Sequence, residues 1–468
     1  MSNKNSKNRR FANTTIIRAC KFVHMLMTIG VFAVCLDFYN TRYNDYGVGD
    51  RRFFIFVCLY TALLFFSLRT YKAYGFGMTK SSILIYSQTL SVLVTDVAFY
   101  VVFVVANSKV FNPLPLMLFF AAQMCINCIW TLIANRIYFK LNKPKKTMIL
   151  YNKESELLRL EEIYSRKKNF EITEKVKYEK DGDWAEHIDK CEVAFLAGLP
   201  TDERNFIFEY CIEKNVQCYT APYTGDIIMM GATHLDMFSV PVFEVSRAVP
   251  NVEYLFVKRF VDVVCSLLGI IILSPVMAFT AIAIRLYDKG PALYKQVRLT
   301  RNGKEFEIYK FRSMRVNAES DGVARLATDN DDRITPIGKF IRACRLDELP
   351  QLFNILKGDM SIVGPRPERP EIAQQYLEEY PEFNLRLQVP AGLTGLAQVY
   401  GRYNTEPADK LQMDLMYINE MSLLQDFRLI MATVKILFMK DSTSGTAEGQ
   451  TTAMAKSDEA KSENLQNN

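Results

Sequence analysis

The sequence predicts a membrane protein that joins α-helical membrane segments to two α/β units. Four long apolar blocks lie in the N-terminal part of the chain, at 15–38, 52–68, 82–106 and 114–138. Each is close to the ~20 residues that a membrane-spanning helix needs. Strand and helix patterns then alternate over 141–250, and a fifth apolar block, 258–286, opens a second α/β region.

Both ends of the chain are polar. Residues 1–14 look like a disordered cytosolic tail, and no small-residue cleavage site follows the first apolar block, so a cleaved signal is not expected. Residues 441–468 have the polar composition of a second disordered tail. The expected parts between them are four transmembrane helices at 15–140, an α/β domain at 141–250, and a membrane helix with a second α/β domain at 251–440.

Basic residues alternate along the first four apolar blocks. They gather in 1–14, in the connection at 69–80 and again at 136–146. The first connection carries Arg42, Arg51 and Arg52 but also Asp45 and Asp50, and the third carries only Lys109. The positive-inside rule therefore places both ends of this four-helix bundle in the cytoplasm. Asp96 lies well inside the third block, where an ionisable residue can mark a functional site. A role in helix–helix packing is the alternative for Asp96.

The α/β unit at 141–250 has the pattern of a small parallel sheet of Rossmann type. Short apolar stretches at 148–151, 193–196 and 216–219 predict strands, and 203–214 predicts a helix. The first strand is followed by Asn-Lys-Glu-Ser, so the GxGxxG turn of dinucleotide-binding domains is absent. A regulatory, spacing or assembly role is expected instead.

The fifth apolar block has features of a re-entrant helix. Lys258 and Arg259 precede it, Arg285 stands at its end, and Ser274 with Pro275 lies in its middle. Proline removes a backbone hydrogen bond and bends a helix. A straight crossing would also leave the two α/β domains on opposite sides of the membrane. A helix that enters and leaves on the cytosolic face is therefore favoured, with Lys258 and Arg259 as anchors among lipid headgroups.

A pair of adjacent carboxylates, Asp347 and Glu348, marks the candidate site. Pro350 suits the first turn of a short helix and Gly358 suits its end, so the pair stands where a helix begins. Arg366, held between two prolines, brings a guanidinium nearby. Carboxylates, a helix N-terminus and a fixed arginine can together handle a phosphate and a metal ion. The alternative is a capped helix followed by a Pro-rich turn.

Two further cations and a Gly-rich loop belong to the same region. Lys310 and Arg312 stand two residues apart after an alternating strand, 305–311, which puts them on one face of an extended chain. Arg312 and Arg366 can hold phosphate oxygens with paired donors, although a surface salt bridge is the alternative for Arg312. The loop at 390–399 contains Thr394 and Gln398, which have no specific expected role.

Composition excludes several other classes of function. The net charge of +6 is too small and too dispersed to indicate nucleic-acid binding. Only three histidines occur, without clustering, so a zinc site is not expected. The ten cysteines are scattered and form no disulfide framework. Cys125 and Cys128 form a CxxC in an apolar block, where packing in lipid is favoured over redox chemistry.

The region from about 255 to 440 resembles the bacterial sugar transferase family, the monotopic phosphoglycosyl transferases. Several ordered motifs carry the resemblance: Lys-Arg-Phe-x-Asp at 258–262, Ser-Pro at 274–275, Lys-Phe-Arg-Ser-Met at 310–314, Asp-Glu-Leu-Pro-Gln-Leu-Phe-Asn at 347–354, Lys-Gly-Asp-Met-Ser-Ile-Val-Gly-Pro-Arg-Pro at 357–367 and Pro-x-Gly-Leu-Thr-Gly at 390–395. The whole chain resembles the larger, exopolysaccharide-type members, in which four membrane helices and a degenerate Rossmann-like domain precede the catalytic unit.

The resemblance implies a reaction and a location. A UDP-sugar would give its hexose-1-phosphate to undecaprenyl phosphate with release of UMP, as the first membrane step of exopolysaccharide or capsule synthesis. Asp347 would be the nucleophile, Glu348 would assist it, and the two would share Mg²⁺, with Lys310, Arg312 and Arg366 near the phosphates and nucleotide. The resemblance also implies a multi-pass protein of the bacterial inner membrane with a cytosolic catalytic domain.

Other readings remain open from the sequence. An inactive polytopic scaffold of a polysaccharide-assembly complex would also use membrane helices and a degenerate α/β domain, and the intact Asp347–Glu348 pair argues against it. A transporter is disfavoured because the helices carry few charges and show no convincing repeat. A transferase that moves sugar without phosphate would release UDP. The sequence leaves open which sugar is used, although glucose or galactose is favoured, and whether the chain forms a homodimer.

Overall fold

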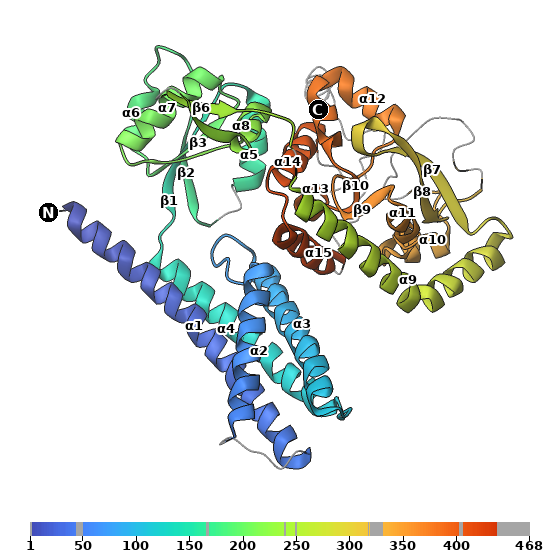
Figure 1. The fold of residues 1–468 in the computed structure, drawn as a ribbon. Helices are drawn as coiled ribbons and strands as arrows, with labels where there is room; N and C mark the ends of the chain where they lie inside the picture. The colour runs from blue at the N-terminus through green and yellow to red at the C-terminus, as the bar shows by residue number, and fades with distance from the viewer. Residues whose placement is uncertain are drawn as a thin grey trace. The chain divides into compact units, whose positions relative to one another are not determined.

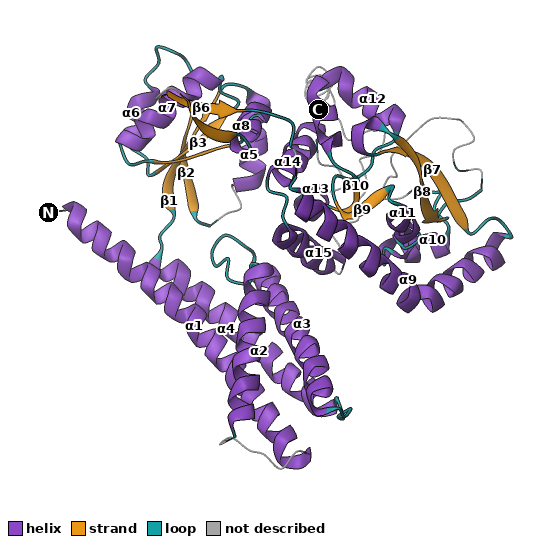
Figure 2. Cartoon of the chain, viewed as in Figure 1, coloured by secondary structure: helices purple, strands orange, loops and turns teal. Residues whose placement is uncertain are grey.

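The computed structural model describes residues 2–43, 50–164, 168–237, 240–248, 250–316, 318, 331–401 and 406–437. The chain divides into two compact units, Met1–Ala221 and Pro222–Asn468, each with its own elements (Figures 1 and 2). Five helices of the described residues are long and apolar enough to cross a membrane. The chain is therefore a membrane protein, as the sequence predicts.

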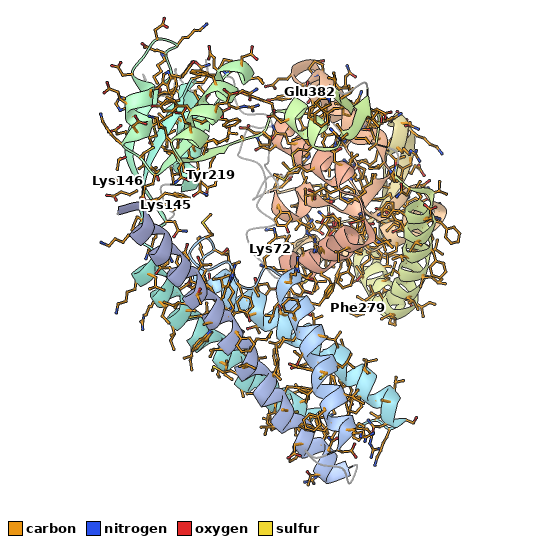
Figure 3. The ribbon with its side chains drawn as sticks, turned by 60° about the vertical axis from the view of Figure 1, so that its left-hand side comes forward. Lys72, Lys145, Lys146, Tyr219, Phe279 and Glu382 are labelled. Carbon is orange, nitrogen blue, oxygen red and sulfur yellow. The ribbon has the colours of Figure 1, made fainter. Side chains whose placement is uncertain are left out.

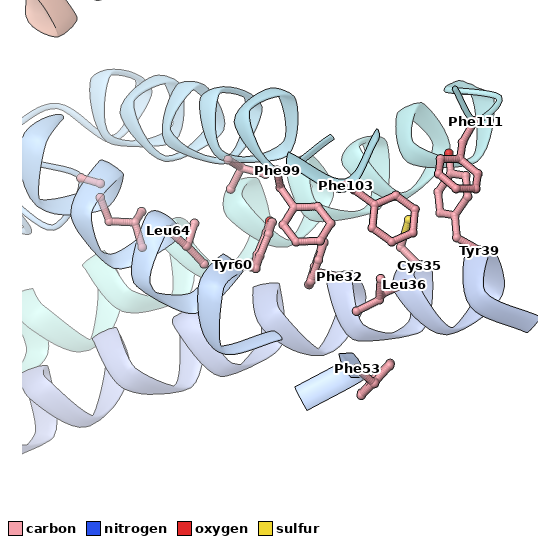
Figure 4. Close-up of a cluster of buried hydrophobic side chains, with 13 residues drawn as sticks. Phe32, Cys35, Leu36, Tyr39, Phe53, Tyr60, Leu64, Phe99, Phe103 and Phe111 are labelled. Carbon is pink, nitrogen blue, oxygen red and sulfur yellow. The ribbon is translucent and has the colours of Figure 1, made fainter. Parts of the chain in front are cut away.

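The first unit begins with four of these helices. They are α1 (Ser2–Tyr43), α2 (Arg51–Thr70), α3 (Ser81–Asn107) and α4 (Leu114–Leu141). Their shared core is aromatic: Phe32 stacks on Tyr60 with 3.6 Å between ring centroids, and Phe99 packs edge-on against Phe32 (Figure 4). Helix α1 begins at Ser2, so residues 2–14 are helical where the sequence predicts disorder. The predicted tail at 441–468 lies outside the described residues.

Hydrogen bonds between buried polar side chains connect these helices. The Tyr60 hydroxyl donates to Asp96 Oδ1 at 2.8 Å, and Gln123 donates to the Tyr60 oxygen at 3.0 Å. His24 contacts Asn127 at 2.9 Å in the same interior. Interhelical hydrogen bonds of this kind stabilise helix association in lipid. The Tyr60 bond to Asp96 fits the packing alternative, whereas Asp96 Oδ2 is buried without a hydrogen-bond partner among the described residues, so both expectations for Asp96 stay predictions.

A four-stranded parallel sheet forms the rest of the first unit. Its strands are β1 (Lys145–Tyr151), β2 (Phe170–Lys177), β3 (Val193–Ala197) and β4 (Gln217–Thr220), in the order β2-β1-β3-β4. Figure 3 labels Lys145, Lys146 and Tyr219 on β1 and β4. The predicted strands match β1, β3 and β4. Strand β2 was not predicted; its side chains alternate between half-buried and exposed in the structure.

Helices cover both faces of this sheet. Met148 and Leu150 point to one face, where they pack with α6 (Trp184–Asp189) and α7 (Thr201–Glu213). Ile149 points to the other face, toward α5 (Glu154–Tyr164). The alternation follows from the two-residue period of a strand. The first turn of α5 carries Glu154 and Glu156, whose charges disfavour an anion at that helix end.

The second unit opens with α8 (Thr224–Met230), the hairpin of β5 (Thr233–Met237) with β6 (Val240–Glu244), and the long helix α9 (Val252–Asp288). Figure 1 shows that α9 is bent into two arms. Pro275 lies inside the helix and cannot donate to the carbonyl of Ile271. The Ser274 hydroxyl donates to that carbonyl at 2.8 Å instead. Phe279, labelled in Figure 3, is 74% exposed on α9, as a lipid-facing side chain would be.

The remaining elements form a compact α/β domain after α9. They are β7 (Leu293–Leu299), η1 (Arg301–Gly303), β8 (Glu305–Phe311), α10 (Pro336–Ala343), η2 (Leu346–Glu348), α11 (Gln351–Lys357), β9 (Met360–Val363), α12 (Pro370–Glu379), η3 (Pro381–Gln388), β10 (Ala391–Thr394), α13 (Leu396–Tyr400), α14 (Pro407–Asn419) and α15 (Leu423–Leu437). Strands β7 and β8 pair antiparallel, and β9 and β10 pair parallel. The largest apolar cluster of the domain joins β9, α12, η3, α14 and α15.

The Ser274 contact leads to a stability prediction. Replacing Ser274 with alanine leaves the Ile271 carbonyl without a hydrogen-bond donor in an apolar setting, which costs about 1–3 kcal/mol. We expect Ser274→Ala to lower the thermal unfolding midpoint of the protein in nanodiscs. Thr280→Val is the matched control, because Thr280 Oγ1 donates at 2.8 Å to Val276, whose carbonyl keeps an intrahelical amide donor. Equal losses in the two variants would contradict the assignment.

Candidate active site

The predicted carboxylates Asp347 and Glu348 lie on η2, a single 3₁₀ turn between α10 and α11. Arg345, with φ of 56°, starts the turn in the left-handed region. Pro350 precedes the first residue of α11, and Gly358 ends that helix with φ of 94°. The expected proline start and glycine stop are therefore present. The turn places Glu348 beside Lys310 of β8 and Arg366 of the loop that follows β9.

Three cations surround the Glu348 carboxylate. Arg366 Nη2 donates to Glu348 Oε1 at 3.1 Å. The same oxygen lies 3.5 Å from Arg345 Nη1 and 3.9 Å from Lys310 Nζ. The Glu348 side chain is only 13% exposed. The structure thus brings the predicted Lys310 and Arg366, together with Arg345, around the buried negative charge of Glu348.

The neighbouring cations determine the protonation state of Glu348. Burial alone would raise the pKa of Glu348, but Arg366, Lys310 and Arg345 outweigh burial and hold that pKa at about 2. Burial lowers the pKa of Lys310 to about 8, against the opposing effect of Glu348. Glu348 is therefore charged at neutral pH. Its negative charge is already balanced before any substrate arrives.

Asp347 has a different environment from its neighbour. Within the described part of the chain, Asp347 Oδ1 is buried without a hydrogen-bond partner. Burial raises the pKa of Asp347, and the charge of Glu348 raises it further, while Lys310, Arg342 and Arg345 act in the opposite direction. A buried oxygen without a partner is costly and often marks a functional atom. Arg342, on α10, is a nearby cation that the sequence analysis missed.

The loop that carries Arg366 is fixed by contacts to its backbone. Arg386 Nη2 donates to the Arg366 carbonyl at 2.8 Å. The carbonyls on either side are also occupied: Pro365 accepts from Gly392 N at 2.8 Å and Pro367 from Arg298 Nη1 at 3.3 Å. These contacts place the Arg366 guanidinium against Glu348.

The Gly-rich loop packs against this segment. A Cβ on Gly392 would lie 2.1 Å from Gly364 N, and one on Gly395 would lie 2.2 Å from Gly364 O, so only glycine fits. Thr394 Oγ1 contacts Thr433 Oγ1 at 2.5 Å, and Gln398 Nε2 donates to Leu393 O at 3.2 Å. Close backbone packing therefore explains the glycines of this loop, whereas Thr394 and Gln398 make contacts within the protein and their roles stay open.

A buried ion cluster lies behind the Arg366 loop. Arg386 is 2% exposed and donates through Nε to Asp414 Oδ2 at 2.8 Å. Glu368 Oε1 lies 3.5 Å from Arg386 Nη1 and 2.8 Å from Lys410 Nζ. None of these residues was predicted. The signal was Arg386 within the apolar run Leu-Arg-Leu-Gln-Val, since a charge buried in such a run needs a partner.

The hydrogen bonds of the Arg312 side chain within the described residues go to Asp288 and Pro291, not to the carboxylate pair. Its guanidinium forms a two-bond pair with Asp288 at 2.6 and 2.5 Å, and Arg312 Nε donates to Pro291 O at 2.7 Å. Strand β8 ends at Phe311, and Arg312 N still donates to Ala292 O at 2.9 Å beside that strand end. Arg312 is thus engaged in joining the end of α9 to the domain, and its phosphate-binding role stays a prediction.

The two expected headgroup anchors also make contacts within the protein. Lys258 Nζ donates to Asp426 Oδ2 at 2.7 Å, and both side chains are about nine-tenths buried. Arg259 donates to the carbonyls of Ile355 and Leu356 at 2.7 and 2.9 Å, which are at the end of α11. These contacts attach α9 to the domain. Binding of Lys258 and Arg259 to lipid headgroups stays a prediction.

The ion cluster leads to a prediction for acid stability. Burial alone would raise the pKa of Glu368, but Lys410 and Arg386 hold it at about 2, below its ordinary 4.5. The lowered pKa stabilises the fold above pH ~4.5, by about 3 kcal/mol, and this contribution is lost as the pH falls toward 2. We expect the melting midpoint of Glu368→Gln to lie below that of wild type at pH 7 and to approach it at low pH. Glu371 is the control, because its carboxylate is exposed. The melting midpoint of Glu371→Gln should change between pH 7 and pH 3 by as much as that of wild type.

Comparisons with known proteins match the second unit. The family model described as bacterial sugar transferase matches residues 253–440. A UDP-N-acetylgalactosamine-undecaprenyl-phosphate N-acetylgalactosaminephosphotransferase of Aeromonas hydrophila is 40% identical over 197 residues, covering 42% of this chain and 46% of that protein. An undecaprenyl-phosphate galactose phosphotransferase of Salmonella typhimurium is 40% identical over 40% of this chain and 41% of its own length.

A shorter relative is covered more fully. A UDP-glucose:undecaprenyl-phosphate glucose-1-phosphate transferase of Caulobacter vibrioides is 40% identical over 41% of this chain and 73% of its own length. The chain matches under half the length of the Aeromonas and Salmonella proteins. The matched residues contain the carboxylate pair, Lys310, the Arg366 loop and the Gly-rich loop. On this evidence the chain belongs to the bacterial sugar transferase family.

Proposed function

We propose that this protein transfers a hexose-1-phosphate from a UDP-sugar to undecaprenyl phosphate and releases UMP. The observation that carries the proposal is the asymmetry of the carboxylate pair. Glu348 is held charged by three cations, whereas Asp347 Oδ1 is buried without a hydrogen-bond partner among the described residues. A carboxylate that is desolvated and surrounded by cations is suited to attack an electrophilic phosphorus.

The proposed course has two steps. In the first, an Asp347 oxygen bonds to the phosphorus that carries the sugar, the bond bridging the two phosphates breaks, and UMP leaves with the electron pair. The product on the enzyme is a phosphosugar-aspartyl acyl phosphate. In the second, a phosphate oxygen of undecaprenyl phosphate bonds to the same phosphorus, and the bond between that phosphorus and the Asp347 oxygen breaks with its electron pair left on the carboxylate. Asp347 is restored, and the lipid carries the sugar through a diphosphate.

The cations around the pair suit this chemistry. Arg366 is 33% exposed while it contacts Glu348, so part of its guanidinium can meet substrate phosphate. Arg342 and Lys310 add positive charge beside Asp347. Repulsion between a carboxylate and a diphosphate is the main obstacle to the first step. Fixed positive charges lower it without reorganisation.

Mg²⁺ is the proposed cofactor. Among the described residues no group of three or more His, Cys, Asp or Glu side chains could hold a metal ion. Asp347 and Glu348 would hold Mg²⁺ with substrate phosphates completing its ligands, since Mg²⁺ commonly uses one or two carboxylates with phosphates and water. The buried, unpaired Asp347 Oδ1 fits such a ligand. When bound, Mg²⁺ neutralises phosphate charge and favours ionised Asp347.

The membrane arrangement supports an acceptor in lipid. We infer that α9 is re-entrant in the bacterial inner membrane and that the catalytic domain is cytosolic. The first four helices would form the multi-pass bundle, followed by a Rossmann-like domain without a nucleotide role. The bend in α9 lets its apolar surface enter one leaflet, so the active site can stay at the depth of a lipid phosphate.

The sugar is not fixed by the relatives, whose names give N-acetylgalactosamine, galactose and glucose. Glucose or galactose remains the leading proposal. An inactive scaffold of a polysaccharide-assembly complex is the competing function. The intact Asp347–Glu348 pair, with Lys310 and Arg366 beside Glu348, argues against it.

UMP release tests the reaction directly. Purified protein in nanodiscs would be given undecaprenyl phosphate, Mg²⁺ and one of UDP-glucose, UDP-galactose, UDP-N-acetylglucosamine or UDP-N-acetylgalactosamine. We expect UMP from one donor, and a loss of about 10³-fold or more in Asp347→Asn, because a neutral amide is a poor nucleophile. Glu371→Gln is the matched surface control. UDP in place of UMP would contradict phosphosugar transfer, and wild-type turnover in Asp347→Asn would contradict the nucleophile.

The path of α9 is tested by accessibility. Single cysteines at Asn251 and Arg301, both exposed and on either side of α9, would be placed in a variant without the ten native cysteines. We expect a membrane-impermeant thiol reagent to label neither in intact cells and both in inverted vesicles. Pro275→Ala should straighten α9, expose position 301 on the other side and reduce UMP release. Opposite-side labelling of the wild-type helix would exclude the re-entrant path.

A further inference from the structure

We propose that Arg386 is a positioning residue for the transfer, acting through the Arg366 loop. This inference rests on the proposed function for its kinetic meaning. Arg386 does not contact the carboxylate pair in the described structure. Its Nη2 donates at 2.8 Å to the carbonyl of Arg366, and Arg366 in turn donates to Glu348 at 3.1 Å. Asp414, Arg386, Arg366 and Glu348 therefore form one connected series.

The position of Arg386 is itself closely determined. Its Nε and Nη2 lie 2.8 and 2.7 Å from Asp414 Oδ2, and its Nη1 lies 3.5 Å from Glu368 Oε1. Its side chain is 2% exposed, and the Asp414 side chain is 1% exposed. A guanidinium held by two carboxylates in the interior has little freedom to move. It can therefore fix the carbonyl to which it donates.

The loop needs such a donor because its prolines limit other contacts. Pro365 and Pro367 have no amide hydrogen, so the segment cannot be held by a regular strand ladder. Gly364 N, before the loop, donates to Thr394 O at 2.8 Å, and Leu299 N donates to Glu368 O, after it, at 3.0 Å. The Arg366 carbonyl between them is held by Arg386. The Pro365 and Pro367 carbonyls keep their own donors, Gly392 N and Arg298, so loss of the Arg386 bond would free the Arg366 carbonyl alone and let this peptide move the guanidinium from Glu348.

The expected effect is on turnover, because misplacement of a charged group by about 1 Å can cost about 10²-fold in rate. Arg386→Gln removes the contact directly but leaves Asp414 and Glu368 with less positive charge. Arg386→Met with Asp414→Leu removes the same donor and replaces the ion pair with apolar groups of similar size, a change that is often neutral for stability. The second variant keeps the test valid if the first does not fold.

A double-mutant cycle with Arg366→Ala measures whether Arg386 acts through Arg366. We expect UMP turnover to fall about 10- to 100-fold in Arg366→Ala and in each Arg386 variant. Combining the changes should lower it no more than about threefold beyond Arg366→Ala alone. Lys258→Met with Asp426→Leu replaces another buried ion pair of this domain. When this control is combined with Arg366→Ala, the fold-loss in UMP turnover should equal the product of the two separate fold-losses. Multiplicative losses for Arg386 as well would overturn the proposal.

Hydrogen–deuterium exchange gives a readout that does not depend on activity. When Arg386→Met is combined with Asp414→Leu, we expect faster exchange in the peptides covering 364–369 and 345–349 only. Faster exchange across the whole domain would reduce Arg386 to a structural residue and overturn the proposal. If wild type releases no UMP from any donor, the proposed function fails, and the exchange pattern still decides whether Arg386 fixes the loop.

Discussion

The buried charge of Glu348 is the interaction on which the rest of the catalytic domain depends. A carboxylate that is 13% exposed is costly unless cations compensate it. The compensating groups come from separate parts of the fold: Lys310 from β8, Arg345 from the start of η2, and Arg366 from the loop after β9. The charge is tolerated only when all three segments are in place. Assembly of the site and folding of the domain are thus coupled.

The same dependence extends to the membrane helix. Arg259 on α9 donates to the last carbonyls of α11, and Asp262 Oδ1 accepts from Ile362 N on β9 at 3.0 Å. Helix α11 follows the carboxylate pair, and β9 leads into the Arg366 loop. One arm of α9 therefore holds the elements on both sides of the site. A change in the depth or bend of α9 would reach the carboxylates through two hydrogen-bonded contacts.

Local patterns were enough to predict much of this architecture. The apolar blocks, the strand 305–311 and the Pro350 and Gly358 boundaries depend on neighbouring residues, and the structure confirms them. Arg312 shows the limit of such patterns. Its spacing from Lys310 predicts a shared face but not its partner, since Asp288 is brought within reach of its guanidinium only by the fold. The Arg386 cluster was missed because its partners come from 368 and 414, which are paired only by the fold.

The two adjacent carboxylates have different environments although their chemistry is the same. Glu348 interacts with three cations, which keep it ionised and hold it in place. Asp347 receives weaker compensation, and its buried Oδ1 has no hydrogen-bond partner within the described residues. The atom that we propose as the nucleophile is therefore the one that the fold leaves without a hydrogen-bond partner among the described residues. Its neighbour provides the fixed charge against which cations are arranged, and those cations are then ready for the phosphates of the proposed substrates.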